Sequence, residues 1–388
     1  MSTDFGISTD ELERQGAAHT AREIAQQPAV WRETGEILRS RREDIGAFLR
    51  PLLGRRDLRV VLTGAGTSAF VGEILAPALS RRLGRRFDAV ATTDIVSNPN
   101  EYLAEDLPTL LVSFARSGNS PESAAATALA DQRLSECHHL VLTCDPEGRL
   151  YEDHSGADRS FALLMPERAN DQGFAMTSSF TSMLLAAWLV LDEVAPEGLI
   201  ERLAGAAETL LSTRCDGARE LASSGYERVV YLGSGPLEGL AHESALKMLE
   251  LTAGAVVTLF DSPMGFRHGP KSILDERTLA VVYVSGDPYT RHYDLDLIAE
   301  LRQSMRPESI VAVTTTPDAE PEEGGAWMLD GLGGVEDPAL ALPFVLVAQL
   351  LGLYFSLALG RTPDNPFPDS EVNRVVQGVK IHPLEERR

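Results

Sequence analysis

The sequence predicts an α/β protein made of two tandem, doubly wound parallel-sheet domains. Each domain is expected to be an α-β-α sandwich, and a helical arm and an irregular tail lie at the two ends of the chain. Two observations predict this fold. Apolar β-runs alternate with helical segments of about 10–15 residues, a pattern typical of a parallel sheet covered on both faces. Three landmarks also recur in order, at offsets of 169 positions (Gly64 and Gly233), 168 (Gly118 and Gly286) and 170 (Val141 and Val311).

The N-terminal arm, residues 1–53, is expected to be helical from residue 9, where Thr9 or Asp10 can cap the first turn. Pro28 interrupts this run. The first domain covers residues 54–199. Its expected strands are 59–63, 87–92, 109–113, 140–143 and 160–164, and its expected helices are 69–83, 120–135 and 179–194.

The second domain, residues 200–362, repeats this order after a connecting helix at 200–224. Strands are expected at 228–232, 256–260, 279–284 and 310–313, and helices at 237–251, 293–306 and 339–359. Residues 317–325 are expected to form an acidic loop. The tail, residues 363–388, is rich in proline and is expected to be irregular.

Composition excludes several classes of partner. The net charge is −22, which opposes binding to nucleic acid or to an anionic membrane. Two long apolar runs, 174–191 and 339–359, carry polar residues and lack flanking basic residues, so both are predicted to be buried core helices. The three cysteines are few and odd in number, and no leader segment is visible. These features predict a cytoplasmic protein without disulfides.

Two loops are predicted to bind a phosphate group. The segment Gly64-Ala65-Gly66-Thr67-Ser68 follows one strand, and the segment Arg116-Ser117-Gly118-Asn119-Ser120 follows another. Each loop opens a helix, whose N-terminus favours an anion. A dinucleotide fingerprint is the alternative for the first loop, with Asp88 as its acidic residue. The hydroxyls and the arginine together favour a single phosphomonoester, although each hydroxyl taken alone also suits a helix cap.

A helix and a loop in the second half are predicted to carry acid–base chemistry. Glu243, Lys247 and Glu250 share one face of a helix, because they are spaced i, i+4 and i+7. A solvated stripe of ion pairs is the alternative, but the neighbouring positions are mostly small or apolar. His268 lies in a loop framed by Gly and Pro, where histidine suits proton transfer. The other histidines show no constellation, no cysteine–histidine cluster has zinc spacing, and neither metal nor cofactor is expected.

The long strings 113–123, 174–180 and 264–271 resemble the sugar isomerase (SIS) domain family, and the likeness covers nearly the whole chain as two SIS domains. Within the family, the chain is most similar to the galactosamine-6-phosphate deaminase/isomerase group, whose members are also called tagatose-6-phosphate ketose/aldose isomerases. The chain also resembles the isomerase half of glucosamine-6-phosphate synthase. Its motif Ala115–Ser120 departs from that of the synthase, and no lysine matches the synthase's Schiff-base position, so synthase activity is not expected.

The resemblance implies roles for particular residues. Glu250 would move a proton between C1 and C2, Lys247 would line that site, and His268 would open the sugar ring. The residues implied in substrate binding are Gly66, Thr67, Ser68, Arg116, Ser117, Gly118, Ser120, Thr177 and Ser178. A homodimer is implied, with His268 donated across its interface.

The expected function is conversion of galactosamine 6-phosphate, or a similar hexosamine 6-phosphate, to a ketose 6-phosphate such as tagatose 6-phosphate plus ammonia. Because an imine intermediate reacts with water, the enzyme is expected to be a hydrolase as well as a deaminase and isomerase. Two alternatives stay open. One is aldose/ketose isomerisation without deamination, and the other is a sugar-phosphate-binding regulatory module.

Overall fold

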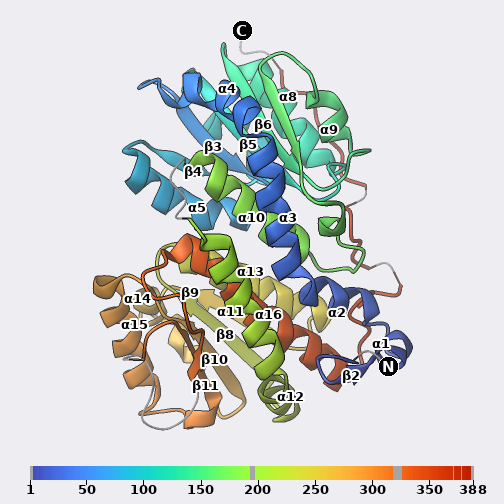
Figure 1. Ribbon diagram of the computed structural model, residues 1–388, viewed down its shortest axis with the longest axis vertical. Helices are drawn as coiled ribbons and strands as arrows, with labels where there is room; N and C mark the ends of the chain where they lie inside the picture. Colours follow the sequence, from blue (N-terminus) through green and yellow to red (C-terminus); the bar gives the residue numbers. More distant parts are fainter. Residues whose placement is uncertain (1–2, 193–196, 318–325, 370, 377, 386–388) are drawn as a thin grey trace. The chain divides into compact units, whose positions relative to one another are not determined.

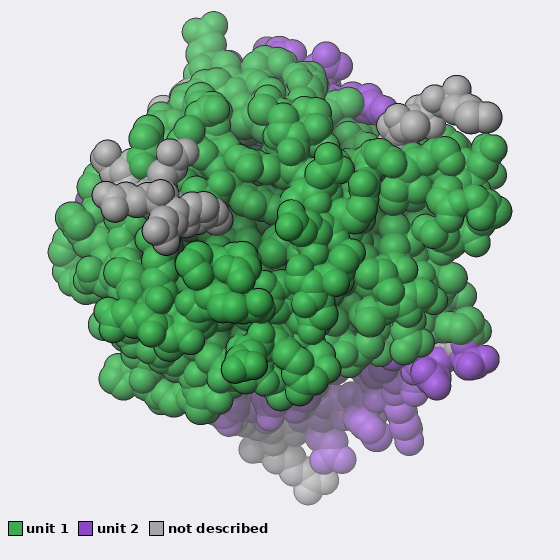
Figure 2. Space-filling view, turned by 90° about the horizontal axis from the view of Figure 1, so that it is seen from below, with its two compact units in different colours: residues 1–32, 171–178, 196–368 green, residues 33–170, 179–195, 369–388 purple. Residues whose placement is uncertain are grey.

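The computed structural model describes residues 3–192, 197–317, 326–369, 371–376 and 378–385. Its tertiary contacts divide the chain into two compact units, which Figure 2 shows in different colours. Unit 1 comprises Met1–Arg32, Asp171–Ser178 and Pro196–Pro368, and unit 2 comprises Glu33–Asn170, Ser179–Ala195 and Asp369–Arg388. The domain boundaries given above for the linear sequence stay a prediction.

Unit 2 contains a five-stranded parallel sheet with the strand order β4-β3-β5-β6-β7 (Figure 1). The strands are β3 (Arg59–Thr63), β4 (Phe87–Ala89), β5 (Thr109–Ala115), β6 (Cys137–Thr143) and β7 (Ser160–Leu164). The helices that connect or flank them are α4 (Arg42–Leu53), α5 (Thr67–Leu83), α6 (Thr92–Ser97), α7 (Pro99–Tyr102), α8 (Pro121–Arg133) and α9 (Arg149–His154). Helices α3 (Gln27–Ser40) and α10 (Ser178–Leu191) contribute most of their residues to this unit.

Unit 1 contains a second five-stranded parallel sheet, with the strand order β12-β11-β10-β8-β9. Its strands are β8 (Arg228–Gly233), β9 (Val257–Asp261), β10 (Thr278–Tyr283), β11 (Ile310–Thr314) and β12 (Ala326–Met328), and a short antiparallel pair joins β1 (Thr3–Asp4) to β2 (Ile7–Ser8). Its helices are α1 (Thr9–Arg14), α2 (Ala18–Ala25), α11 (Leu199–Thr213), α12 (Cys215–Ser223), α13 (Pro236–Leu251), α14 (Pro263–Phe266), α15 (Pro288–Leu301) and α16 (Asp337–Ala358).

The two sheets have the same strand order when β3, β4, β5, β6 and β7 are matched to β8, β9, β10, β11 and β12. The prediction of a duplicated, parallel α/β fold is therefore confirmed. In both sheets the first strand lies beside the third, so the loops that follow these two strands leave the same edge. Ligands of open α/β sheets bind at such an edge, outside the carboxyl ends of the strands.

Several predicted boundaries are wrong for local reasons. The helix expected over 200–224 is two helices, because the chain leaves the helical conformation at Arg214, between α11 and α12. Helix α15 begins five residues before the expected start, because the Asp287 side chain caps the backbone N–H groups of Tyr289 and Thr290. Residues 318–325 of the expected acidic loop lie outside the described residues.

Both long apolar runs form helices, α10 and α16. Helix α16 is long and apolar enough to cross a membrane, but nearly all of its most apolar stretch is buried inside the structure. The core helix of a soluble protein has the same length and composition. The prediction of a buried core helix is confirmed for α16, which packs on α13 and so supports the helix that carries the acidic and basic residues.

Candidate active site

The first predicted phosphate loop is a tight turn between β3 and α5. A Cβ atom on Gly64 would lie 2.6 Å from the carbonyl oxygen of Ser68, so only glycine fits there. Gly66 has φ of 54°, a conformation that side chains disfavour. The turn places Thr67 and Ser68 in the first turn of α5, with both residues largely buried. Backbone N–H groups and hydroxyls thus meet at a helix N-terminus, which favours an anion.

The second loop connects β5 to α8, beside the first. Thr63 of β3 is in register with Ser113 of β5, so both loops leave neighbouring strands. Ser120 is the residue before α8, and Ser117 accepts a hydrogen bond from the N–H of Asn119 at 3.3 Å. Both of these serines are partly exposed. The structure therefore brings the predicted hydroxyls of unit 2 to one edge of one sheet.

Arg116 supplies positive charge to this edge. Its side chain is only 6% exposed, and its Nη2 donates a hydrogen bond to the carbonyl oxygen of Arg374 at 3.1 Å. The C-terminal segment is thereby tied to the second loop. A guanidinium is suited to bind a phosphate oxygen, because it carries several donors in a fixed plane.

Two further hydroxyls at this edge were missed in the sequence. The Oγ1 of Thr63 and the Oγ of Ser113 are buried and make no hydrogen bond within the described part of the chain. They end the apolar runs of β3 and β5, just before the two loops. A hydroxyl at the end of a buried strand was the available signal, because buried polar groups are normally paired.

Unit 1 carries the predicted acid–base residues on α13. Lys247 is fully buried, and its Nζ lies 2.6 Å from Glu250 Oε2 and 3.5 Å from Glu243 Oε1. Burial lowers the pKa of Lys247, but the two carboxylates outweigh this effect and raise the pKa overall. Lys247 is therefore a buried ammonium. The alternative of a solvated stripe is wrong, because Glu243 is also fully buried.

Glu250 differs from the other two residues of this face because its side chain is 24% exposed. It can therefore meet a substrate while Lys247 holds one of its oxygens. A carboxylate that is fixed in position and still accessible suits the transfer of a proton.

His268 lies in the loop that follows α14. Ser262 caps α14 through the N–H of Gly265, and Phe266 packs into the core of unit 1. The ring of His268 is exposed and makes no hydrogen bond to another described residue. Within the described residues of this one chain, no hydrogen bond or ion pair joins His268 to Lys247 or Glu250.

The loop 171–178 is shaped by two buried carboxylates. Asp171 accepts hydrogen bonds from the N–H groups of Thr177 (2.8 Å) and Ser178 (3.1 Å), and from Thr177 Oγ1 (3.2 Å). Glu23 accepts from the N–H groups of Gln172 and Gly173. Burial and the Asp171 charge raise the pKa of Glu23 to about 7.

Thr177 and Ser178 are themselves fully buried in this loop. The Ser178 hydroxyl donates to the carbonyl oxygen of Glu23 at 2.7 Å. Their hydroxyls thus hold the loop together within unit 1, and direct contact with a substrate stays a prediction.

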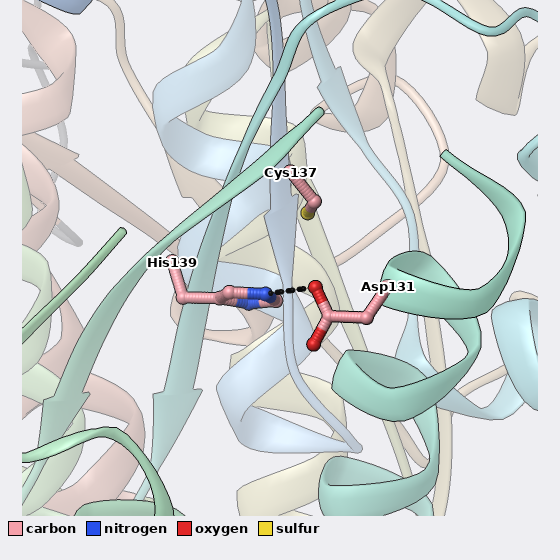
Figure 3. A group of neighbouring side chains, drawn as sticks. All are labelled: Asp131, Cys137 and His139. Carbon is pink, nitrogen blue, oxygen red and sulfur yellow. Dashed lines mark hydrogen bonds and ion pairs between the residues drawn. The ribbon is translucent and has the colours of Figure 1, made fainter. Parts of the chain in front are cut away.

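One group of possible metal ligands lies elsewhere in unit 2: Asp131 on α8, and Cys137 and His139 on β6 (Figure 3). His139 Nε2 lies 2.9 Å from Asp131 Oδ1, and the three ligand atoms lie within 4.8 Å of one another. No sequence pattern indicated this arrangement, and the prediction that His139 belongs to no constellation is wrong. Burial raises the pKa of Cys137 to about 12, which disfavours the thiolate that binds metals. The observed contact is an Asp–His hydrogen bond near the amino end of β6. The two predicted phosphate loops follow the carboxyl ends of β3 and β5, at the opposite edge of the same sheet.

Comparison with known proteins bears on the chemistry predicted for the phosphate loops and for α13. The SIS domain model matches residues 53–192. The chain is 61% identical over 373 residues to a Streptomyces coelicolor protein provisionally named D-galactosamine-6-phosphate deaminase AgaS, with 95% of this chain and 96% of that protein covered. It is 46% identical over 369 residues to an Escherichia coli D-galactosamine-6-phosphate deaminase AgaS, with 94% and 95% covered. The crystal structure of the tagatose-6-phosphate ketose/aldose isomerase from Escherichia coli matches with a TM-score of 0.87 at 44% identity, and 95% of this chain and 97% of that chain are covered.

These relatives correct one prediction. They are named as deaminases and as ketose/aldose isomerases, and none of these names is that of a hydrolase. The expected classification as a hydrolase is therefore wrong.

Proposed function

The chain belongs to the SIS-domain family of sugar-phosphate deaminases and isomerases, and from this premise we propose that it converts galactosamine 6-phosphate to tagatose 6-phosphate and ammonia. The observation that carries the proposal is the likeness, over nearly the full length of both chains, to proteins named D-galactosamine-6-phosphate deaminase. The chain is an enzyme, and a purely regulatory sugar-phosphate-binding module does not need a buried ammonium held against an accessible carboxylate.

In the proposed complex, the substrate phosphate lies against the two loops of unit 2. Gly66, Thr67 and Ser68 supply the first helix N-terminus, and Ser117, Gly118 and Ser120 supply the second. Arg116 adds positive charge at the start of the second loop. This assignment is supported by the meeting of both loops at one sheet edge and by the affinity of helix N-termini for phosphate.

The reaction then requires three changes in the sugar. His268 assists opening of the ring, which leaves an aldehyde at C1 and the amine on C2. Glu250 removes the C2 proton and delivers a proton to C1, so that C2 becomes an imine and C1 carries an alcohol. Water adds to C2 and ammonia leaves, which gives the ketose.

Lys247 serves this proton transfer in two ways. Its ammonium fixes one oxygen of Glu250, at 2.6 Å, and it places positive charge near the enolate-like intermediate. Stabilising a charge that develops during the reaction is a large contribution to catalysis. The raised pKa of Lys247 keeps the group cationic across the neutral pH range.

The proposed assembly is a homodimer in which His268 reaches the active site of the partner. The support is the exposure of the His268 ring and of three large apolar side chains of the same unit. Leu249 is 42% exposed, Val257 is 53% exposed and Met264 is 45% exposed. Val257 also opens β9, which is an edge strand of its sheet. A partner that covers these side chains would remove apolar surface from water.

A cytoplasmic location is also proposed. All three cysteines (Cys137, Cys144 and Cys215) are free and buried, as suits a reducing compartment.

A second candidate is isomerisation of tagatose- or galactose-type 6-phosphates without loss of ammonia, and the name of the solved Escherichia coli relative favours it. A panel of hexosamine and hexose 6-phosphates separates the two candidates when ammonium and ketose are both measured. The proposal expects ammonium and ketose in equal amounts from galactosamine 6-phosphate. Ketose formation from the hexose 6-phosphates, with no ammonium from any amino sugar, would replace the proposal by the second candidate.

A further inference from the structure

Unit 1 repeats the backbone of the phosphate loops of unit 2. The residue before α13 is Gly235, with φ of 57° and ψ of −121°, and the residue before α5 is Gly66, with φ of 54° and ψ of −128°. The residues before α15 and α8, Asp287 and Ser120, are both extended, and each is followed by proline. Since the strand order is also the same, unit 1 has a second pair of loops of the kind that we assign to phosphate.

The groups that these loops offer differ between the units. Pro236 stands where unit 2 has Thr67, so one backbone N–H and one hydroxyl are lost. The second loop is also shorter. Gly64 and Gly233 are 169 positions apart but Pro121 and Pro288 are only 167 apart, so two residues are missing before α15. The donors that remain in the two loops of unit 1 come from Ser234, Ser285 and the N–H of Gly286.

Two carboxylates of unit 1 take up these donors. Asp294, from the second turn of α15, accepts hydrogen bonds from Ser234 Oγ at 2.5 Å and from the N–H of Ser285 at 2.9 Å. Asp337, the first residue of α16, accepts from Ser285 Oγ at 2.6 Å and from the N–H of Gly286 at 2.7 Å. The first loop of unit 1 therefore donates a hydroxyl hydrogen bond to a carboxylate of the same chain. The second loop donates both hydroxyl and backbone N–H hydrogen bonds to such carboxylates.

The carboxylates lie deep at this edge. Asp294 is fully buried and Asp337 is 9% exposed. Burial raises the pKa of Asp294 to about 6 and also raises the pKa of Asp337, while their hydrogen bonds oppose the shift. Asp294 therefore remains mostly ionised at neutral pH, and so an incoming phosphate would meet charge of its own sign as well as occupied donors.

We infer that the loops of unit 1 form a duplicate anion cradle that Asp294 and Asp337 fill, so that one chain takes one phosphomonoester and a latent second site is held closed from within. The count of one rests on the proposed function, which assigns phosphate to unit 2. The filling of the cradle in unit 1 rests only on the contacts of the two carboxylates.

Binding of inorganic phosphate to the purified full chain, measured by equilibrium dialysis with radiolabelled phosphate, tests this inference. The wild type should bind one phosphate per chain. The double variant Asp294→Ala, Asp337→Asn removes one carboxylate and neutralises the other, so it should bind two. The isosteric pair Asp294→Asn, Asp337→Asn leaves the cradle filled and should bind one. Two phosphates on the wild type, or no more phosphate on the alanine variant than on the wild type, would overturn the inference.

Asp106→Ala is the matched control. Asp106 accepts hydrogen bonds from the N–H and the hydroxyl of Ser135, at 2.7 and 2.6 Å, but no glycine turn adjoins it. Its loss should leave one phosphate per chain. A second bound phosphate in this control would also contradict the inference, because any freed serine would then bind an anion.

Folding of the alanine variant provides a second readout, since a ligand that binds only the folded state stabilises it. Phosphate should raise the melting temperature of this variant more than that of the isosteric pair. A variant that is insoluble with and without phosphate, beside a soluble isosteric pair, would overturn the inference, since phosphate would then not replace the carboxylate.

The proposed function can fail separately. A wild type that binds no phosphate, beside an alanine variant that binds one, would refute the assignment of phosphate to unit 2 and leave the filled cradle standing.

Discussion

Lys247 Nζ lies 2.6 Å from Glu250 Oε2, and the lysine is fully buried while the glutamate is 24% exposed. The two residues are three positions apart on α13, so the helix itself fixes their separation. This pair contributes both to the proposed chemistry and to the stability of unit 1. Each of its two residues can be tested by its own substitution.

Glu250→Gln should lower kcat by about 10²–10⁴-fold, the usual contribution of a general acid–base group. The amide keeps the size of the side chain but cannot take the C2 proton. Phosphate affinity should be unchanged. Steady-state kinetics with galactosamine 6-phosphate measure the effect, and Glu220→Gln, on the exposed face of α12, is the matched control. Full turnover by Glu250→Gln would refute its role as the base.

Lys247→Met should destabilise the protein by about 3–5 kcal/mol, because it removes the ammonium that faces the buried carboxylate of Glu243. Adding Glu243→Gln should recover part of this loss, since the buried charge is then gone. Urea unfolding of the wild type, both single variants and the double variant measures the coupling. Strictly additive effects of the two substitutions would show that the residues do not interact.

Ser117→Ala should raise KM for the sugar phosphate by about 10-fold or more and change kcat little, because a hydrogen bond to a charged group contributes about 1.5–3 kcal/mol. The phosphate is remote from C1 and C2, so its binding is the same in the ground state and the transition state. Ser135→Ala, whose hydroxyl binds Asp106, is the control. A loss confined to kcat would place Ser117 at the reacting carbons instead.

The stability of the protein should depend on Glu23 between about pH 5 and pH 8. Its folded pKa of about 7 is above its ordinary value of 4.5, so protonation favours the folded state. The stabilisation is present at low pH and is lost as the pH rises through 7. Asp171 raises this pKa and Arg22 opposes the shift.

Glu23→Gln should therefore flatten the fall in unfolding free energy, which is on the order of 3 kcal/mol in the wild type over this range. Urea unfolding at a series of pH values measures both slopes. Glu220→Gln should keep the wild-type slope. Equal slopes in the wild type and Glu23→Gln would show that another group titrates.

The repeated strands could be predicted because each sheet is buried on both faces, so its strands are continuous apolar runs such as 59–63 and 310–313. Short helices such as α6, α7 and α9 could not, because four to six residues give no periodic pattern. Strand β12 was missed for a similar reason, since its three residues give no alternation.

In the candidate site, too, some features could be predicted from the sequence and others could not. The spacing of Glu243, Lys247 and Glu250 fixes one helix face, so their contacts followed from the sequence. The partners of loop 171–178 did not, because Glu23 lies 150 positions from Gly173 and only the tertiary fold brings them together. Asp294 was missed likewise, since nothing local marks a carboxylate that will face a glycine turn.

The central claim is that Glu250 carries hydrogen between C2 and C1 before ammonia leaves. Galactosamine 6-phosphate labelled with deuterium at C2, followed by proton NMR during turnover, tests it most directly. The account predicts that the label leaves C2 and is found at C1 of the ketose or in solvent, with one ammonium per ketose, and that Glu250→Gln stops both events. Label movement and ammonium release at wild-type rates in Glu250→Gln would contradict the account.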